Sequence, residues 1–503
     1  MWPKIKTAWL NGNIVQACFL DVSAAFDKVW HKGLLAKLEQ VGVEDKCLDL
    51  FKSYLSNRKQ TVVVDGVKSD ILEVQASVPQ GSRLGPLLFI LYIEDIQTDL
   101  ESDILIFADD TSLLATGHDP AQTVQQLNRD LIKISNWAVK WKVTFNASKT
   151  KEIIFSNKFL NNSPPLTFNS EIIKRVTTHK HLGVHLTSNL DWKKQVHEVC
   201  MKANMKLAVL RSVKCLQRGT LDLLYKLTVR SVLDYGLILY YNNLTQSDKN
   251  RLDQIQYKAA KLVTGALHLT NRTKLDSELG WETLATRAEC LGLTLFQKIR
   301  LGQTRPLIRQ CMPDFDPNYI THDLRHKRFY KPFPLGNLKY SNSFFPHFTK
   351  SLEQLPSDIK TEGDIEMFKS KLKLKYKPIR HRHFSRGSKR GNSLLTHIRT
   401  GRSFLNTHSF SIGLSDSPSC SCSHISESPQ HFFLDCTLYT QERLSMTNSI
   451  QQYLPKFNSY TKTKKLNTLL QGFNPENKDL FHTNVNLQLI VQNFILKTKR
   501  FDI

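Results

Sequence analysis

The chain has 503 residues, 41% of them hydrophobic, so it is long enough for several domains and too apolar to be disordered over most of its length. Its 69 Lys and Arg against 45 Asp and Glu leave a net charge of +24, which indicates a polyanionic partner, nucleic acid before an anionic membrane. With nine scattered cysteines, no secretory signal and no apolar run near the roughly 18 residues of a transmembrane helix, we expect a reduced, intracellular protein without a membrane partner.

The first predicted element is a short buried strand, the apolar run Ala17 to Leu20, which ends at Asp21. A helix is predicted around residues 31–41, where leucines recur at helical spacing. Residues 61–74, TVVVDGVKSDILEV, predict a hairpin with an Asp-Gly turn, and residues 84–96, LGPLLFILYIEDI, predict a second helix.

The stretch ILIFADDTSLLATG, residues 104–117, predicts a tight hairpin with Asp109 and Asp110 in its turn. Two solvated turn aspartates would be the ordinary explanation of such a pair. If the hairpin lies beside the first strand, however, Asp21 adds a third carboxylate. Oxygen ligands of this kind suit Mg²⁺, and two such ions about 4 Å apart serve phosphoryl transfer.

Between the two acidic segments, SVPQGSRLGP (residues 77–86) predicts a turn whose backbone and Gln80 side chain can approach a flat ligand. Taken alone, this stretch is more often an ordinary loop. The order strand, helix, hairpin, helix, hairpin is typical of a split β-α-β sheet with helices on one face.

Five ordered segments resemble the palm of reverse transcriptases of the non-LTR (LINE-type, jockey-like) retrotransposon family. These segments are LDVSAAFDKVWH, SVPQGSRLGPLLFILYIEDI, FADDT, WAVKWKVTFNASKTKEIIFS and HKHLGVHLTSNLDWKKQV. The resemblance covers about residues 10–300. It implies an α+β fold, with a palm over residues 1–188 and an all-α, thumb-like domain over residues 189–300.

The resemblance also implies roles for single residues. Asp21 and Asp109 are implied as the principal ligands of two Mg²⁺ ions, with Asp110 beside them. The other implied contacts with nucleotide and template are Phe26, a gate against the ribose 2′-OH; Gln80 and Gly81, which touch template and nucleotide; and Lys149, near the triphosphate. Without the resemblance, Phe26 is equally a core aromatic and Lys149 an exposed turn lysine. We expect Asp27 to cap the helix that follows it.

Two residues depart from the family pattern: Ser77 stands where the family has Gly, and Arg83 where it has an apolar residue. In the family, fingers and an endonuclease precede the first motif. Because the chain begins about 20 residues before Asp21, we expect it to be the C-terminal part of a longer element protein, without fingers.

Residues 191–213, 220–236 and 248–267 predict amphipathic helices with Lys and Arg on their outer faces. By resemblance they form the thumb that grips the template-primer backbone; the alternative is an ordinary solvated bundle. The histidines of the HKHLGVH segment, His179, His181 and His185, are expected to be hairpin side chains and not metal ligands.

Residues 301–366 show little periodicity and are expected to be a connector. Residues 367–415 form a basic stretch, in which no Asp or Glu occurs and KSKLKLKYKPIRHRHFSRGSKR contains ten Lys and Arg. Such a stretch predicts nucleic-acid binding, and the same charges suit nuclear localisation, so we expect a nuclear protein.

The segment CSCSHISESPQHFFLDC has the spacing C-x-C-x8-H-x4-C, formed by Cys420, Cys422, His431 and Cys436. Four such ligands suffice for one tetrahedral Zn²⁺, although the tight C-x-C spacing leaves free thiols as the alternative. His424 is the substitute ligand. The segment also resembles the C-terminal Cys/His segment of the same elements. We assign it residues 416–445 and expect a helical tail over residues 446–503.

Together these features predict an RNA-directed DNA polymerase whose partners are an RNA template, a DNA primer and dNTPs. The alternative is a nucleic-acid-binding remnant of such an element that lacks catalysis. The sequence leaves the oligomeric state open.

Overall fold

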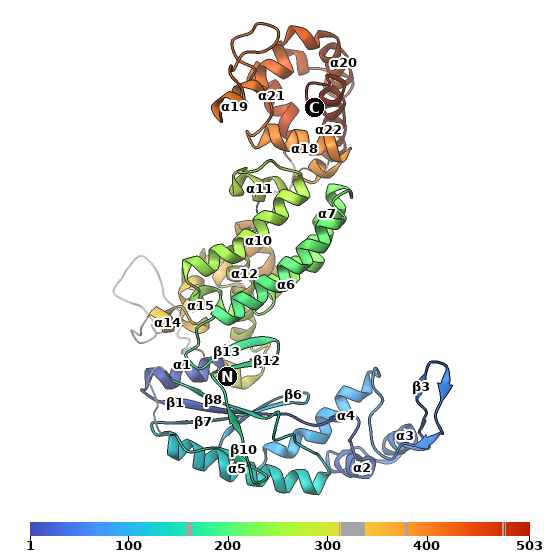
Figure 1. Cartoon of the computed structure of the whole chain (residues 1–503), viewed down its shortest axis with the longest axis vertical. Helices are drawn as coiled ribbons and strands as arrows, with labels where there is room; N and C mark the ends of the chain where they lie inside the picture. Colours follow the sequence, from blue (N-terminus) through green and yellow to red (C-terminus); the bar gives the residue numbers. More distant parts are fainter. Residues whose placement is uncertain are drawn as a thin grey trace. The chain divides into compact units, whose positions relative to one another are not determined.

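The computed structural model describes residues 1–156, 163–310, 312, 338–376, 378, 381–474, 477 and 479–502. Residue 311 and residues 313–337 of the expected connector, residues 377, 379 and 380 of the basic stretch, and residues 475, 476, 478 and 503 of the expected tail lie outside the described residues. The chain divides into two compact units, Met1–Gln195 and Val196–Ile503, with an α+β fold in the first and helices in the second (Figure 1). The boundary falls in the first turn of α6 (Lys193–Ser212).

Before α6, the first unit contains five α-helices, one 3₁₀ helix and thirteen strands among its described residues. In chain order they are α1 (Trp2–Leu10), β1 (Ile14–Leu20), α2 (His31–Gln40), α3 (Asp45–Leu55), β2 (Lys59–Gln60), β3 (Val63–Val64), β4 (Val67–Lys68), β5 (Leu72–Glu73), α4 (Leu84–Ile93) with the 3₁₀ turn η1 (Glu94–Gln97), β6 (Asp103–Phe107), β7 (Asp110–Gly117), α5 (Pro120–Trp141), β8 (Lys151–Phe155), β9 (Thr167–Phe168), β10 (Glu171–Ile172), β11 (Lys174–Arg175), β12 (Thr178–His181) and β13 (Val184–Thr187).

A mixed five-stranded sheet in the order β11-β8-β1-β7-β6 forms the centre of this unit. The central strand β1 runs antiparallel to β7 and to β8, β6 pairs antiparallel with β7, and β11 is parallel to β8. The predicted strand before Asp21 and the predicted hairpin at residues 104–117 are therefore confirmed, and they lie side by side.

Helix α5 covers one face of the sheet. Successive strand residues point to opposite faces, and Gln16, Cys18 and Leu20 of β1 share the face toward α5. There Cys18 and Leu20 join the hydrophobic core with apolar residues of α5, and Thr123 of α5 donates a hydrogen bond of 2.6 Å to the Gln16 side chain.

The opposite face of the sheet is also covered, by α1 and by the β12–β13 hairpin (Figure 1). Phe19 of β1 stacks on His179 of the hairpin, with ring centroids 4.1 Å apart, and Trp9 of α1 donates a hydrogen bond of 3.1 Å to the backbone oxygen of Phe155 in β8. The prediction that helices cover one face only is therefore wrong. Every residue of β1 is buried, so both of its faces require a cover.

The helices predicted around residues 31–41 and 84–96 are confirmed as α2 and α4, which pack against each other. The predicted hairpin at residues 61–74 is confirmed as well: β3 and β4 pair antiparallel, and β2 pairs with β5. Val62, Val63, Val64 and Val67 of this hairpin are exposed.

The second unit consists of helices. Besides α6 they are α7 (Arg218–Leu224), the π-helix η2 (Tyr225–Arg230), α8 (Ser231–Asp234), α9 (Leu237–Tyr240), η3 (Tyr241–Asn243), α10 (Gln246–Thr264), α11 (Arg272–Leu279), α12 (Leu284–Arg300), α13 (Pro306–Arg309), α14 (Leu338–Ser341), α15 (Phe344–Glu353), α16 (Ser357–Lys360), α17 (Ile365–Tyr376), η4 (Arg382–Ser385), α18 (Lys389–Arg399), α19 (Asn406–Ser411), the π-helix η5 (His431–Asp435), η6 (Thr437–Tyr439), α20 (Thr440–Gln451), η7 (Phe457–Ser459), α21 (Lys462–Gln471) and α22 (Phe481–Lys497). None of the described helices is both long enough and apolar enough to span a membrane.

The described part of the expected connector belongs to a hydrophobic core. Phe344, Phe345 and Phe348 of α15 pack with apolar residues of α12 and α17. The helices α12 and α15 approach so closely that a Cβ on Gly292 would lie 1.8 Å from the Phe348 ring. This part of the chain is therefore packed structure and not a linker.

The basic stretch, the Cys/His segment and the C-terminal tail share a second hydrophobic core. It contains apolar residues of α18, η5, α20, α21 and α22, with Phe432, Phe433 and Phe494 among them. The part of the basic stretch from α18 onward thus forms one folded body with the other two segments, because each supplies an apolar face that the others bury. The part of the basic stretch within α17 packs in the core of α12 and α15 instead.

Candidate active site and metal centre

The three aspartates predicted to bind metal lie at one end of two neighbouring strands. The pairing of β1 with β7 runs up to the residue before Asp21 and the residue after Asp110. In the β6–β7 hairpin, Ala108 and Asp109 form a two-residue turn, and Ala108 adopts the left-handed conformation with φ of 52°. The sheet thus brings the single carboxylate and the pair to the same edge.

These carboxylates influence one another. Asp109 and Asp110 are exposed, and the Asp21 side chain is 41% exposed. Partial desolvation raises the pKa of Asp110; positive charge on His181 opposes this rise, and the negative charges of Asp109 and Asp21 add to it. The site therefore concentrates negative charge that a cation would neutralise.

The aspartates are not gathered into a closed set of ligands. Within the part of the chain that the structure describes, the Cys/His segment supplies the one group of three or more His, Cys, Asp or Glu side chains compact enough to hold a metal ion. Carboxylates repel one another, so we expect such a set to close only around a cation.

The segment that precedes β8 borders the aspartates. The backbone nitrogen of Asn146 donates to the backbone oxygen of Asp21 at 2.8 Å. This contact holds Lys149 at the site, with its ammonium nitrogen 3.9 Å from a carboxylate oxygen of Asp21. The Lys149 side chain is 68% exposed, so it is free to turn toward an anionic ligand.

The loop before α4 is tied to the segment that follows Asp21. The backbone nitrogen of Val78 donates to the oxygen of Phe26, and that of Ser77 to the oxygen of Val29, both at 2.9 Å. The half-buried Phe26 ring packs on Phe89 of α4, with centroids 4.9 Å apart. Two of the predicted motifs therefore form one wall beside the aspartates.

Asp27 does not cap a helix, so that prediction is wrong. Helix α2 begins at His31, and its N-cap residue, Trp30, has no side-chain cap. Instead, the Gln80 side-chain nitrogen donates to the Asp27 carboxylate at 2.7 Å. Gly81, next in the chain, has φ of 80°, a conformation that favours glycine.

The predicted β12–β13 hairpin is confirmed, and it places two histidines beside the sheet. His179 and His181 both pack on Phe19, and burial lowers the pKa of His179 to about 4. The electrostatic influence of His181 on Asp110 puts it near the site. The sequence pattern did not predict this proximity, because nothing in a hairpin signal says which strand the hairpin will cover.

The four predicted zinc ligands come together in the second unit. Their ligand atoms all lie within 4.8 Å of one another. The Cys422 sulfur is 3.2 Å from His431 Nε2, and the Cys420 and Cys436 sulfurs are 3.7 Å apart. A zinc tetrahedron with bonds of about 2.3 Å to sulfur has sulfur–sulfur edges of about 3.8 Å, so the group already has nearly the required size.

Local structure explains this arrangement. A tight turn, in which the Cys420 nitrogen donates to the His424 oxygen at 2.9 Å, brings the first two cysteines together. The π-helix η5 starts at His431 and ends just before Cys436. His424, the expected substitute ligand, stacks on His431 with centroids 4.1 Å apart and is not part of the compact group. Burial raises the pKa of Cys420 to about 12 in the absence of metal.

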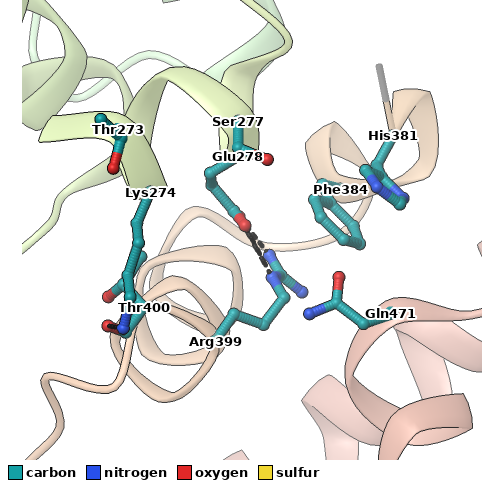
Figure 2. A pocket seen from close by; sticks show the side chains of 9 residues that line it. All are labelled: Thr273, Lys274, Ser277, Glu278, His381, Phe384, Arg399, Thr400 and Gln471. Atoms are coloured by element: carbon teal, nitrogen blue, oxygen red, sulfur yellow. Dashed lines mark hydrogen bonds and ion pairs between the residues drawn. The ribbon is translucent and has the colours of Figure 1, made fainter. Parts of the chain in front are cut away.

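A cavity of about 350 Å³ in the second unit is lined by Glu278 and Arg399 (Figure 2). With Arg218 they form a buried charge cluster that the sequence patterns did not predict. Glu278 accepts hydrogen bonds from Arg399 at 2.6 Å and from Arg218 at 2.8 Å, and all three side chains are at least 96% buried. Burial alone would raise the pKa of Glu278, but the two guanidiniums, Arg399 first, outweigh it and hold that pKa at about 2. The residues lining the cavity are Thr273, Lys274, Ser277, Glu278, His381, Phe384, Arg399, Thr400 and Gln471.

Comparison with known proteins gives the following matches. The family "Reverse transcriptase (RNA-dependent DNA polymerase)" matches residues 4–226. The "RNA-directed DNA polymerase from mobile element jockey" of Drosophila melanogaster is 28% identical over 344 residues, which are 65% of this chain and 37% of that protein. The "Probable RNA-directed DNA polymerase from transposon X-element" of the same species is 31% identical over 294 residues, 56% of this chain and 32% of that protein.

The chain thus spans about a third of the length of the curated relatives that it matches first. Among solved structures, the apo telomerase of Candida tropicalis is 14% identical, with a TM-score of 0.32, over 52% of this chain and 44% of that one.

Proposed function

We infer that this chain belongs to the reverse transcriptase family of jockey-like non-LTR retrotransposons, and from that premise we propose that it adds deoxynucleotides to the 3′-OH of a DNA primer on an RNA template, with Mg²⁺. One observation carries the proposal: the end of β1 and the β6–β7 turn present Asp21, Asp109 and Asp110 at the same edge of one sheet. Three mutually repelling carboxylates at an exposed edge serve no packing role.

The donors fit Mg²⁺. They are hard carboxylate oxygens, and their exposure leaves room for the phosphates and waters that complete the coordination of this ion. Two bound Mg²⁺ ions would supply an activated primer hydroxyl and neutralisation of the leaving pyrophosphate. We assign Asp21 and Asp109 as principal ligands, with Asp110 beside them.

Other residues at the site bind and orient the substrates. Lys149, 3.9 Å from Asp21, is placed to neutralise the triphosphate. Phe26, held against Phe89, is the gate beneath the incoming sugar that excludes a ribose 2′-OH. Gln80 and Gly81, on the loop tied to the Phe26 segment, contact the template and the incoming nucleotide.

For the rest of the chain we assign residues 1–188 to a palm and residues 189–300 to a thumb whose basic helices hold the template-primer backbone. The Cys/His group takes one structural Zn²⁺, because four protein ligands close the coordination shell and leave no position for a substrate. We assign the basic stretch, residues 367–415, to nucleic-acid binding; its part from α18 onward shares a core with the Cys/His group.

Primer extension on an RNA template with dNTPs and Mg²⁺ tests the polymerase. The wild type is compared with the Asp109→Asn, Asp110→Asn double variant, which should extend the primer at least about 1000-fold more slowly because it loses metal ligands worth several kcal/mol in the transition state. The matched control is Asp65→Asn with Asp70→Asn, two exposed aspartates of the residue 61–74 hairpin; it has the same charge change and should extend normally.

Failure of both the wild type and the double variant to extend would contradict the proposal. If both then bind template-primer with equal, salt-sensitive affinity, the chain is a nucleic-acid-binding protein without polymerase activity.

A further inference from the structure

The hydrogen bond between Asp27 and Gln80 joins two motifs that are 53 residues apart in the chain. Neither residue is buried, so the contact adds little to the hydrophobic core. It lies within the wall formed by the Phe26 segment and the loop before α4. Because this bond is exposed, its main effect is on the direction in which the Gln80 side chain points.

The backbone on both sides of this bond is already held. Besides the two backbone bonds of Ser77 and Val78, the His31 ring bonds to the Ser77 oxygen at 2.8 Å. Ser82 donates through its hydroxyl to the Pro79 oxygen at 2.8 Å and accepts from the Gly85 nitrogen at 2.9 Å. The loop therefore cannot swing freely, and the Gln80 side chain is the part of it left to be oriented.

A carboxylate can only accept hydrogen bonds, so it selects one end of an amide. Asp27 binds the Gln80 nitrogen. The Gln80 carbonyl oxygen and one N–H then remain for a ligand, and turning the amide over would set two acceptors against each other. On a nucleic acid, the donors that such a carbonyl can meet include base amino groups and the RNA 2′-OH.

We propose that Asp27 is a positioning residue that holds the Gln80 amide with its carbonyl oxygen free to accept a hydrogen bond from the bound template-primer or nucleotide. This role of Asp27 rests on the proposed function. It adds to that function that the Gln80 side chain is fixed in one orientation, with its oxygen as a hydrogen-bond acceptor. Asp27 itself touches neither substrate nor metal; it acts through Gln80.

A double-mutant cycle tests the proposal, with KM for dNTP and kcat measured for the wild type, Asp27→Ala, Gln80→Ala and the pair. We expect Asp27→Ala to raise KM about fivefold, the factor for one ordinary hydrogen bond, with kcat changed less than about twofold. In the Gln80→Ala background the same substitution should have no further effect. Asp27→Asn, whose carbonyl can still accept from Gln80, should restore most of the affinity.

An equal rise in KM caused by Asp27→Ala in both backgrounds would overturn the proposal, as would an Asp27→Asn variant as impaired as Asp27→Ala. Asp70→Ala, an exposed aspartate outside this wall, is the matched control and should leave KM unchanged. If the wild type extends no primer, the polymerase proposal fails separately. The same four variants are then compared by their affinity for an RNA–DNA template-primer, measured by fluorescence anisotropy. Coupled effects of the two substitutions support the positioning role, and additive effects overturn it.

Discussion

The two candidate metal sites of this chain are built in opposite ways. Asp21, Asp109 and Asp110 stand exposed at a strand edge and are not gathered into a compact group, whereas the ligand atoms of the Cys/His group lie within 4.8 Å of one another. Cys420 and Cys436 are 5% and 0% exposed. One site is open and charged, and the other is enclosed before any metal is added.

The chemistry of the ligands explains this difference. Carboxylates carry charge, repel one another and lose hydration when they are packed together. A protonated thiol and a neutral imidazole can be buried side by side at little cost. A catalytic site needs the first arrangement, since substrate must reach the metal; a structural site benefits from the second.

The same contrast separates two carboxylate–cation pairs. Asp21 and Lys149 meet at 3.9 Å with both side chains more than 40% exposed, so solvent screens them. Glu278 lies between two buried arginines, with all three side chains at most 4% exposed, so solvent screens these charges far less. Removing one partner should therefore affect activity in the first unit and stability in the second.

The largest expected effect is on activity. Asp21→Asn should lower nucleotide incorporation at least about 1000-fold through loss of a metal ligand. The free energy of unfolding should change by less than about 1 kcal/mol, since the pair with Lys149 is exposed. Primer extension and urea unfolding measure the two effects. Lys149→Ala is the control for the broken pair, and a large loss of stability in either variant would show that the aspartate edge is structural.

Removing the enclosed ligands should act on metal content and stability together. The purified chain should carry about one Zn²⁺, and Cys420→Ser with Cys436→Ser should carry almost none and lose at least about 3 kcal/mol of stability. Elemental analysis and urea unfolding measure these changes. Cys47→Ser with Cys215→Ser, two exposed thiols, is the matched control. Metal content equal in both double variants would refute the zinc assignment.

Glu278→Gln should cost about 3–5 kcal/mol, because it leaves Arg218 and Arg399 buried without a counter-charge. The exposed pair of Glu366 and Lys369 offers the matched control, and Glu366→Gln should cost under about 1 kcal/mol. Urea unfolding at neutral pH compares the two variants.

The pH dependence of Glu278 follows from its lowered pKa. The carboxylate stabilises the fold above its ordinary pKa of 4.5, and this contribution is lost as the pH falls through the folded value of about 2. The wild type should therefore lose stability between about pH 4.5 and pH 2 more steeply than Glu278→Gln does. Parallel acid-unfolding curves for the two would contradict the role of the arginines.

The smallest expected effect concerns backbone strain near the open site. Ser77 has φ of 112°, a region in which a side chain is strained, and the resemblance places glycine there. Ser77→Gly should stabilise the chain by about 1 kcal/mol, and Gly81→Ala, at φ of 80°, should destabilise it by about as much. Thermal unfolding of both variants tests this, and a Ser77→Gly variant less stable than the wild type would show that the Ser77 side chain compensates for its own strain.

Sequence patterns were most informative where the signal is local. The strand before Asp21, the turn that holds Asp109 and the spacing of the four Cys/His ligands each depend on a few neighbouring residues. The sequence also shows the aromatic residues of α15. Because apolar residues do not recur at helical spacing over a long stretch there, the sequence did not distinguish a packed helix from a connector.

The sequence by itself therefore determined which chemistry the chain carries: an acidic strand edge, a Cys/His ligand set and a strongly basic surface. Only the tertiary structure decided that Asp27 meets Gln80, that His181 lies near Asp110 and that Glu278 is held by two arginines, one of them 121 residues away. Side-chain partners of this kind follow from how helices and strands pack, and packing depends on shape and volume across the whole core, which no local pattern encodes.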